Sequence, residues 1–156
     1  MGDWKRSSRE CLFNELRPEM TAAITAHIEQ YGLEVDPIEI LMCVETTSET
    51  IKKAIIGGSG RAVLTSAFVT PIWLIWAIRG ENPEVAVMSA RLADVVVQDY
   101  AKTQFAKMVP DTGIEVSGSF TDVSERGSAF LGLDEGLVSE RFKETILTTK
   151  QHIKQR

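Results

Sequence analysis

The side chains able to act as nucleophile and base are two cysteines and two histidines, widely spaced in the sequence. Cysteine catalysis requires a thiol within hydrogen-bond reach of a base, and a third group that orients the base. The spacing allows Cys43 to meet His27, but no residue is identified for the orienting role. We expect His27 to pack on a helix face with one nitrogen hydrogen-bonded, and His152 lies near the chain end. The sequence therefore gives no catalytic residue and favours a non-enzymatic protein.

Cys11 and Cys43 are expected to be reduced thiols. Two cysteines so far apart in the sequence cannot form a disulfide framework, and neither belongs to a C-x-x-C pair or a His-rich cluster. We accordingly expect no metal and no cofactor. The first residues, MGDWKRSSRE, are polar and lack the apolar segment of a secretory signal, so the expected location is cytoplasmic.

The triplet Asp111-Thr112-Gly113 is the one that aspartic proteases use, with two carboxylates sharing a proton. Those enzymes have a small residue after the glycine and an apolar approach to the aspartate. Here Ile114 follows and Pro110 precedes, and Pro-Asp-x-Gly is typical of a turn that enters a strand. Catalysis would also need a homodimer to supply a second aspartate, so we expect Asp111 to be a turn residue.

Three cations beside a glycine-rich stretch form a candidate anion site: Lys52, Lys53 and Arg61, near Gly57, Gly58 and Gly60. A flexible glycine-rich backbone can expose N–H groups to a phosphate or carboxylate. The stretch GGSGRAVLTS lacks the Gly-Lys-Ser/Thr ending of a nucleotide loop and leads into an expected strand rather than a helix. The alternative is a solvated loop on an acidic protein.

The segment 61–80 is almost free of charge, and it predicts a buried β-hairpin. Its length approaches the 18 to 20 or so residues that span a bilayer, but Pro71 at its centre and its β-branched residues argue against a membrane helix. We expect strands over Ala62–Val69 and Ile72–Ile78, with no polar alternation in the second. Trp73 and Trp76 then point to opposite faces, and each face needs a cover. The candidates for this cover are an N-terminal helix, a protein partner and a second copy of the chain.

The remaining pattern predicts helices at both ends and short strands between them. Apolar spacing predicts a helix within 14–32 that ends at Gly32, and another from Asp134 onward. A first strand is expected over Ile38–Thr47, followed by a short helical turn over Ser48–Ile56. Further strands are expected over four ranges: 85–90, 93–100, 113–120 and 128–133. A helix extending to Lys107 is the alternative for the second of these ranges, since the segment is rich in alanine.

Composition and charge are those of one globular domain over residues 1–156, with 44% hydrophobic and 25% charged residues. The net charge of −5 and the pI near 5.1 argue against a nucleic-acid partner, because phosphate contacts need a concentrated basic face. Basic residues gather at the two ends, where we expect solvated termini: Lys5, Arg6 and Arg9, then Lys150, Lys154 and Arg156.

Several segments in this order resemble bacterial pleckstrin-homology-like domains of the GRAM-like type: GRAVLTSAFV (60–69), SARLADVVVQDY (89–100), GIEVSGSF (113–120) and SAFLGL (128–133), then a helix around Arg141 and Phe142. The resemblance covers 38–147 and leaves the N-terminal helix outside it. It implies an α+β fold with a strongly bent antiparallel sheet, or a partly open barrel, of about seven strands and a C-terminal capping helix. It also implies an anion site in the loop between the first two strands, where Ser59 departs from the basic residue that the family pattern has.

We therefore expect a non-enzymatic binding or interaction module that engages a protein partner, or self-associates, through an apolar surface at Trp73 and Trp76. One alternative is a small-ligand-binding or enzymatic domain with an internal pocket lined by Met42, Trp73, Trp76 and Met88. Another is attachment to anionic membranes through the Lys52, Lys53 and Arg61 loop, which predicts salt-sensitive binding to vesicles. No transmembrane segment is expected.

Overall fold

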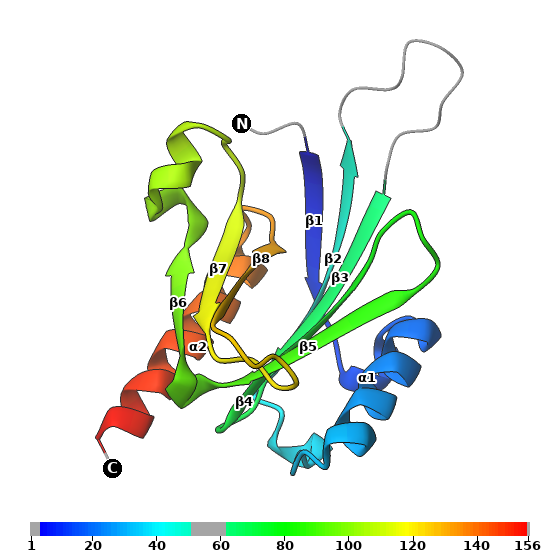
Figure 1. Ribbon diagram of the computed structural model, residues 1–156. Coiled ribbons are helices and arrows are strands. Elements are labelled where there is room, and N and C mark those ends of the chain that lie inside the picture. Colours follow the sequence, from blue (N-terminus) through cyan, green and yellow to red (C-terminus); the bar gives the residue numbers. More distant parts are fainter. Residues whose placement is uncertain (1–3, 51–61, 156) are drawn as a thin grey trace.

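The computed structural model describes residues 4–50 and 62–155. Within these residues the protein is an α+β structure with two α-helices and eight strands in two antiparallel sheets (Figure 1). The sheets remain separate and do not close into a barrel. One hydrophobic core lies between the sheets, and a second lies beneath the N-terminal helix on the other face of the larger sheet.

The larger sheet is a meander in which each strand pairs with the next one along the chain. Its strands are β1 (Trp4–Glu10), β2 (Met42–Thr50), β3 (Ala62–Val69), β4 (Trp73–Arg79) and β5 (Val85–Arg91). The expected hairpin is confirmed as β3 and β4, although β4 begins one residue later than predicted. The Thr70 hydroxyl explains the later start, because it accepts hydrogen bonds from the N–H groups of Ile72 and Trp73 and holds a turn there.

Helix α1 (Pro18–Tyr31) covers one face of β4. It begins with proline at its first position and ends at Gly32, which adopts the left-handed conformation with φ of 60°. Its Met20 and Ile24 belong to the same core as Trp73, Ile75 and Ala77 of β4. The N-terminal helix was one of the covers that the sequence suggested, and Figure 1 shows it lying against this sheet.

The opposite face of β4 is covered by the smaller sheet and by the C-terminal helix. This sheet consists of β6 (Val95–Asp99), β7 (Gly113–Gly118) and β8 (Gly127–Gly132), and helix α2 spans Leu137–Lys154. Trp76 packs edge-to-face on Phe120, with ring centroids 5.4 Å apart. Phe142 and Ile146 of α2 complete the same core. Both faces of the central hairpin are thus covered by the chain itself.

The main corrections concern the two segments around β2. The sequence prediction missed β1, because every residue of WKRSSRE after Trp4 is polar and the segment was interpreted as a solvated terminus. The strand expected over 38–47 instead starts at Met42, after a short 3₁₀ turn η2 (Pro37–Glu39). Residues 48–50 continue this strand and do not begin a helical turn. The described residues therefore contain eight strands where about seven were expected.

The range from residue 93 to Lys107, for which the sequence left open a strand or a helix, contains a strand followed by short turns. Val95–Asp99 is a strand, as predicted, and 3₁₀ turns at Tyr100–Lys102 and Gln104–Lys107 follow it. The β-branched residues of β6 pair with β7, and their stiff side chains suit a pleated sheet better than a helix. The strands expected near 85–90, 113–120 and 128–133 and the C-terminal helix are confirmed within two or three residues.

Candidate functional site

The aspartate of the Asp-Thr-Gly triplet is held in an ion pair. Asp111 accepts two hydrogen bonds from Arg6 Nη2, at 2.9 and 2.8 Å, and one from Arg6 Nε. The side chains of Arg6 and Asp111 are only 8% and 15% exposed, respectively. Thr112 donates its hydroxyl to the Leu133 carbonyl at 2.6 Å. A carboxylate neutralised in this way fastens β1 to the smaller sheet, and it is not arranged to share a proton with a second carboxylate.

Arg6 itself corrects the expectation that the basic residues near the N-terminus are simply solvated. Its Nη1 donates to Ser48 Oγ of β2, and its guanidinium lies 5.5 Å from the centroid of the Phe130 ring. Arg9 pairs with Glu45, which is buried. The alternating burial of β1 turns Arg6 inward, toward the smaller sheet, whereas Lys5 and Arg9 are exposed.

Trp73 and Trp76 do not form an exposed surface. Trp73 is 7% exposed beneath α1, with the Arg91 guanidinium 5.2 Å from its ring centroid. Trp76 has no exposed area, because β4 is the fourth of five strands and has a covered face on each side. The interaction surface expected at these residues is therefore occupied by the chain's own elements.

Some of the other predicted residues lie in or near the core, and the rest lie outside the described residues. Lys52, Lys53 and Arg61, with the three glycines of the expected turn, lie outside the described residues. Of the residues expected to line an internal pocket, Met42 lines a surface hollow, whereas Met88 packs against the core between the sheets. The pocket expected around the two tryptophans is filled by packed side chains.

His27 lies in a hydrogen-bonded cluster that joins α1 to β5 and the loop before β8. Its Nε2 lies 2.8 Å from Ser89 Oγ, and Ser89 Oγ donates to Thr121 Oγ1 at 2.7 Å. One turn further along α1, the Tyr31 hydroxyl donates to Asp122. The expectation of a packed histidine with one satisfied nitrogen is confirmed.

This cluster contains serine and histidine, but it is not arranged for nucleophilic catalysis. Ser89 gives its only hydroxyl proton to Thr121, so His27 Nε2 must be the donor toward Ser89. A catalytic base would have to accept that proton instead. Ser89 also has no exposed area, so a substrate could not reach its oxygen. The cluster positions α1 on the sheet.

Burial lowers the pKa of His27, and the nearby Asp122 carboxylate opposes this only in part. The unfolded chain therefore binds a proton at this position at a higher pH than the native protein does. The stabilising contribution of neutral His27 is complete above its ordinary pKa of about 6.5 and is lost as the pH falls. Urea unfolding at about pH 7.5 and about pH 5.5 should show a larger loss of stability for the natural protein than for His27→Gln. Equal losses would show that His27 is not buried neutral.

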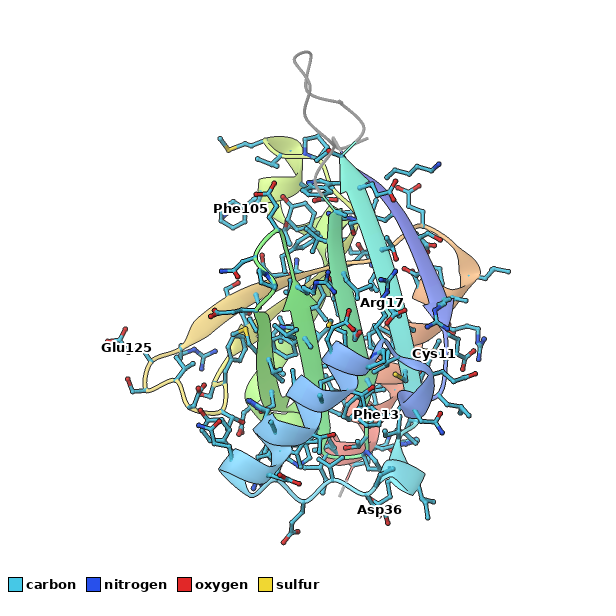
Figure 2. All side chains as sticks on the ribbon, turned by 90° about the vertical axis from the view of Figure 1, so that its right-hand side faces the viewer. Cys11, Phe13, Arg17, Asp36, Phe105 and Glu125 are labelled. Carbon is cyan, nitrogen blue, oxygen red and sulfur yellow. The ribbon has the colours of Figure 1, made fainter. Side chains whose placement is uncertain are left out.

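A surface hollow of about 450 Å³ lies where β1 ends and β2 begins. We call it the β1–β2 hollow, and its lining residues are Glu10, Cys11, Leu12, Phe13, Asn14, Pro37, Ile40, Leu41, Met42 and Cys43. A smaller hollow of about 190 Å³ lies beside it under α1, and Phe13, Pro37 and Ile40 line both. Figure 2 shows Cys11, Phe13 and Asp36 along the same margin of the molecule, with Phe105 at the opposite end.

The rim of the β1–β2 hollow carries unusually exposed apolar side chains. Leu12 is 67% exposed and Leu41 is 49% exposed, and both line the hollow. Ile38, in the 3₁₀ turn beside it, is 90% exposed. Isolated exposed apolar residues are ordinary, but several around a concave apolar surface are typical of a binding site.

Acidic side chains predominate around this hollow, although Glu10 itself pairs with Arg141. Residues 10–40 contain seven acidic side chains and one arginine. The charged residue that lines the β1–β2 hollow is Glu10. The charged residue that lines the smaller hollow is Glu29. Glu34, Asp36 and Glu39 are exposed beside them. An apolar centre with an acidic rim favours a ligand that is apolar and carries positive charge.

The two cysteines meet at the floor of the β1–β2 hollow. Both are free thiols and both are buried, Cys11 at 8% and Cys43 at 2% exposure. The interaction between the two thiols lowers the pKa of Cys11 and raises that of Cys43. Burial opposes the lowering at Cys11 and adds to the increase at Cys43, and the positive charge of Arg9 also lowers the pKa of Cys11. The sequence did not predict that the two cysteines lie side by side.

The described residues contain no group of three or more His, Cys, Asp or Glu side chains able to hold a metal ion. Among the same residues, neither α1 nor α2 has the length and apolar character needed to cross a bilayer. Comparison with protein-family models, with curated proteins and with solved structures gave no match.

Sequence reasoning missed the residues that define the hollow. Leu12, Phe13, Ile40 and Leu41 lie in short irregular segments on either side of α1, where no helical or strand period marks them. The available signal was the presence of bulky apolar residues beside Asn14 and Pro37, in segments with turn character. That signal does not reveal that the two segments meet.

Proposed function

We propose that this protein is a non-enzymatic binding module that holds a short apolar segment of a partner protein in the β1–β2 hollow. The observation that carries the proposal is the combination of a concave apolar surface of about 450 Å³ with exposed Leu12 and Leu41 on its rim. Binding would remove these two side chains from water, and burial of apolar area is the main favourable term in association.

The acidic rim specifies the chemistry of the partner segment. It should contain bulky apolar residues flanked by lysine or arginine, because complementary charge guides association and excludes competing sequences. Self-association through this hollow is less favourable, since a two-fold interface would bring identical acidic rims face to face. Acidic residues of one copy, such as Glu29, Glu34 and Glu39, would then approach acidic residues of the other copy.

We further propose a pleckstrin-homology-like architecture for the core. Seven consecutive strands, β2 to β8, followed by the helix α2 are the order that this resemblance implies. Strand β1 and helix α1 lie outside it and are additions in this chain. The proposal gives them a role, because Cys11–Asn14, between these two additions, are four of the ten residues that line the hollow. We also propose that the module acts in the cytoplasm.

A peptide-selection experiment tests the binding proposal. The full chain is immobilised and a random peptide library displayed on phage is selected against it. Enriched peptides should combine adjacent apolar residues with Lys or Arg, and their affinity should fall by roughly tenfold or more for Leu41→Glu, which places a charge in the hollow. The matched control is Leu147→Glu on α2, because Leu147 is 47% exposed and Leu41 is 49% exposed.

Three results would overturn the proposal. The first is a selection that enriches no peptide of this kind. The second is equal binding of the selected peptides to the Leu41→Glu and Leu147→Glu variants. The third is a dimer of the natural chain in light scattering that Leu41→Glu dissociates, because a second copy would then occupy the hollow. Circular dichroism of both variants verifies that neither substitution unfolds the protein.

A further inference from the structure

Cys11 and Cys43 are directly opposed on neighbouring antiparallel strands. Glu10 pairs with Val44 in the β1–β2 ladder, so the next positions are Cys11 and Cys43, and the Cys11 N–H donates to the Cys43 carbonyl at 3.0 Å. Opposed residues of a hydrogen-bonded pair have Cα atoms about 5.5 Å apart. Disulfide-linked residues have Cα atoms about 4.4 to 6.8 Å apart. The Cα spacing expected for this register therefore lies within the range of disulfide-linked residues.

The side chains also meet the requirements of direction and access. Both thiols lie on the α1 side of the sheet, in the core that contains Phe68 and Trp73. Both residues line the β1–β2 hollow, and the side from which a reagent in solution would approach the pair is this hollow. Cys11 is the more exposed of the two.

We propose that Cys11 and Cys43 form a reversible intramolecular disulfide by exchange with a low-molecular-weight disulfide such as oxidised glutathione. This goes beyond the binding function above and does not depend on it, because the thiol pair would react whether or not the hollow holds a peptide. The thiols stay reduced where glutathione is reduced, and they become linked when the disulfide form accumulates.

The exchange proceeds in two balanced steps. The Cys11 thiolate attacks one sulfur of the small disulfide, so that a mixed disulfide forms at Cys11 and the first small thiolate leaves and takes up a proton. The Cys43 thiol then loses its proton and attacks Cys11 Sγ, which releases the second small thiol. Two protein thiols are oxidised by two electrons, and one small disulfide is reduced to two thiols.

The two cysteines have different roles in this sequence. The attacking thiol should be the one with more thiolate character and better access, and both criteria select Cys11. Cys43 is buried behind it and has a raised pKa, so it is suited to attack only a sulfur already placed against it. The order of attack is therefore a testable part of the proposal.

The test uses the full chain and two variants, Cys43→Ser and Cys11→Ser, each incubated with oxidised glutathione and followed by intact mass and thiol alkylation. The natural chain should lose two hydrogen atoms, lose both alkylatable thiols and yield a peptide linked through Cys11 and Cys43 after proteolysis. Cys43→Ser should stop at a stable glutathione adduct on Cys11. Cys11→Ser should form its adduct at least about tenfold more slowly.

A urea-denatured sample of the natural chain is the control, since both cysteines should then react at similar rates. The proposal is overturned if the folded natural chain keeps two alkylatable thiols, accumulates glutathione adducts at both positions, or forms only disulfides between chains. The assigned order is wrong if Cys11→Ser reacts as fast as Cys43→Ser. Circular dichroism of each variant before oxidation shows that the comparison is between folded proteins.

Discussion

Trp76→Glu is expected to abolish the folded state. The indole has no exposed area and packs on Phe120 between the two sheets. Removing a buried aromatic side chain costs about 3 to 5 kcal/mol, and an unpaired carboxylate in the same place costs several kcal/mol more. Because domains of this size are stable by only about 5 to 15 kcal/mol, the sum should leave an unfolded chain at 25 °C. Loss of the circular dichroism signal and of a cooperative thermal transition is the measurement.

Ile72→Glu is the matched control, since Ile72 lies just before β4 and is 45% exposed. Its effect on the free energy of unfolding should be within about 0.5 kcal/mol, as for other surface substitutions. Trp76→Phe should be much milder than Trp76→Glu, because the indole N–H has no hydrogen-bond partner among the described residues and nothing polar is lost. A folded Trp76→Glu variant with a lost dimer would contradict the packing and restore the predicted interaction surface.

Arg6→Met is expected to lower the free energy of unfolding by about 3 to 5 kcal/mol, because it leaves the Asp111 carboxylate without its partner in a mostly buried position. Arg6 also donates a hydrogen bond to Ser48 of the larger sheet, and its guanidinium lies over the Phe130 ring of the smaller sheet. The substitution therefore removes contacts with both sheets. Urea titration of the single variants Arg6→Met and Asp111→Leu and of their combination measures the coupling. The double variant should recover much of the loss, since no buried charge remains unpaired.

The exposed pair of Arg141 and Glu10 provides the comparison, with side chains 58% and 40% exposed. Arg141→Met should change stability by no more than about 1 kcal/mol. A change at Arg6 as small as the change at Arg141 would mean that β1 is not anchored through this pair. An additive double variant would likewise exclude a direct interaction between Arg6 and Asp111.

Much of the secondary structure could be predicted from the sequence because it depends on local periodicity. The uncharged segment 61–80 predicted the two strands of the central hairpin, and the spacing of apolar residues predicted both helices. Strand β1 was missed because an edge strand with polar residues on both faces has no such signal. Its stabilising partners come from distant parts of the chain, including Asp111 and Asp134.

The candidate site could be predicted much less well than the fold. Lys52, Lys53 and Arg61 were predicted from their place beside a glycine-rich stretch and from the family resemblance, and they lie outside the described residues. Trp73 and Trp76 were predicted from an apolar excess that belongs to the core. The hollow depends on two short irregular segments brought together by α1, and neither has a pattern of its own. Cys11 and Cys43 were judged unrelated because the sequence gives their separation along the chain and not the register of β1 on β2.

Residue types and their spacing along the chain are enough to predict a central strand with two apolar faces, each of which requires a cover. The identity of the covers does not follow from local spacing: α1 lies on one side, and the smaller sheet with α2 lies on the other. Local spacing likewise does not predict that Arg6 pairs with Asp111 or that Cys11 lies opposite Cys43. Such contacts depend on strand register and on the docking of the two sheets, to which the whole chain contributes.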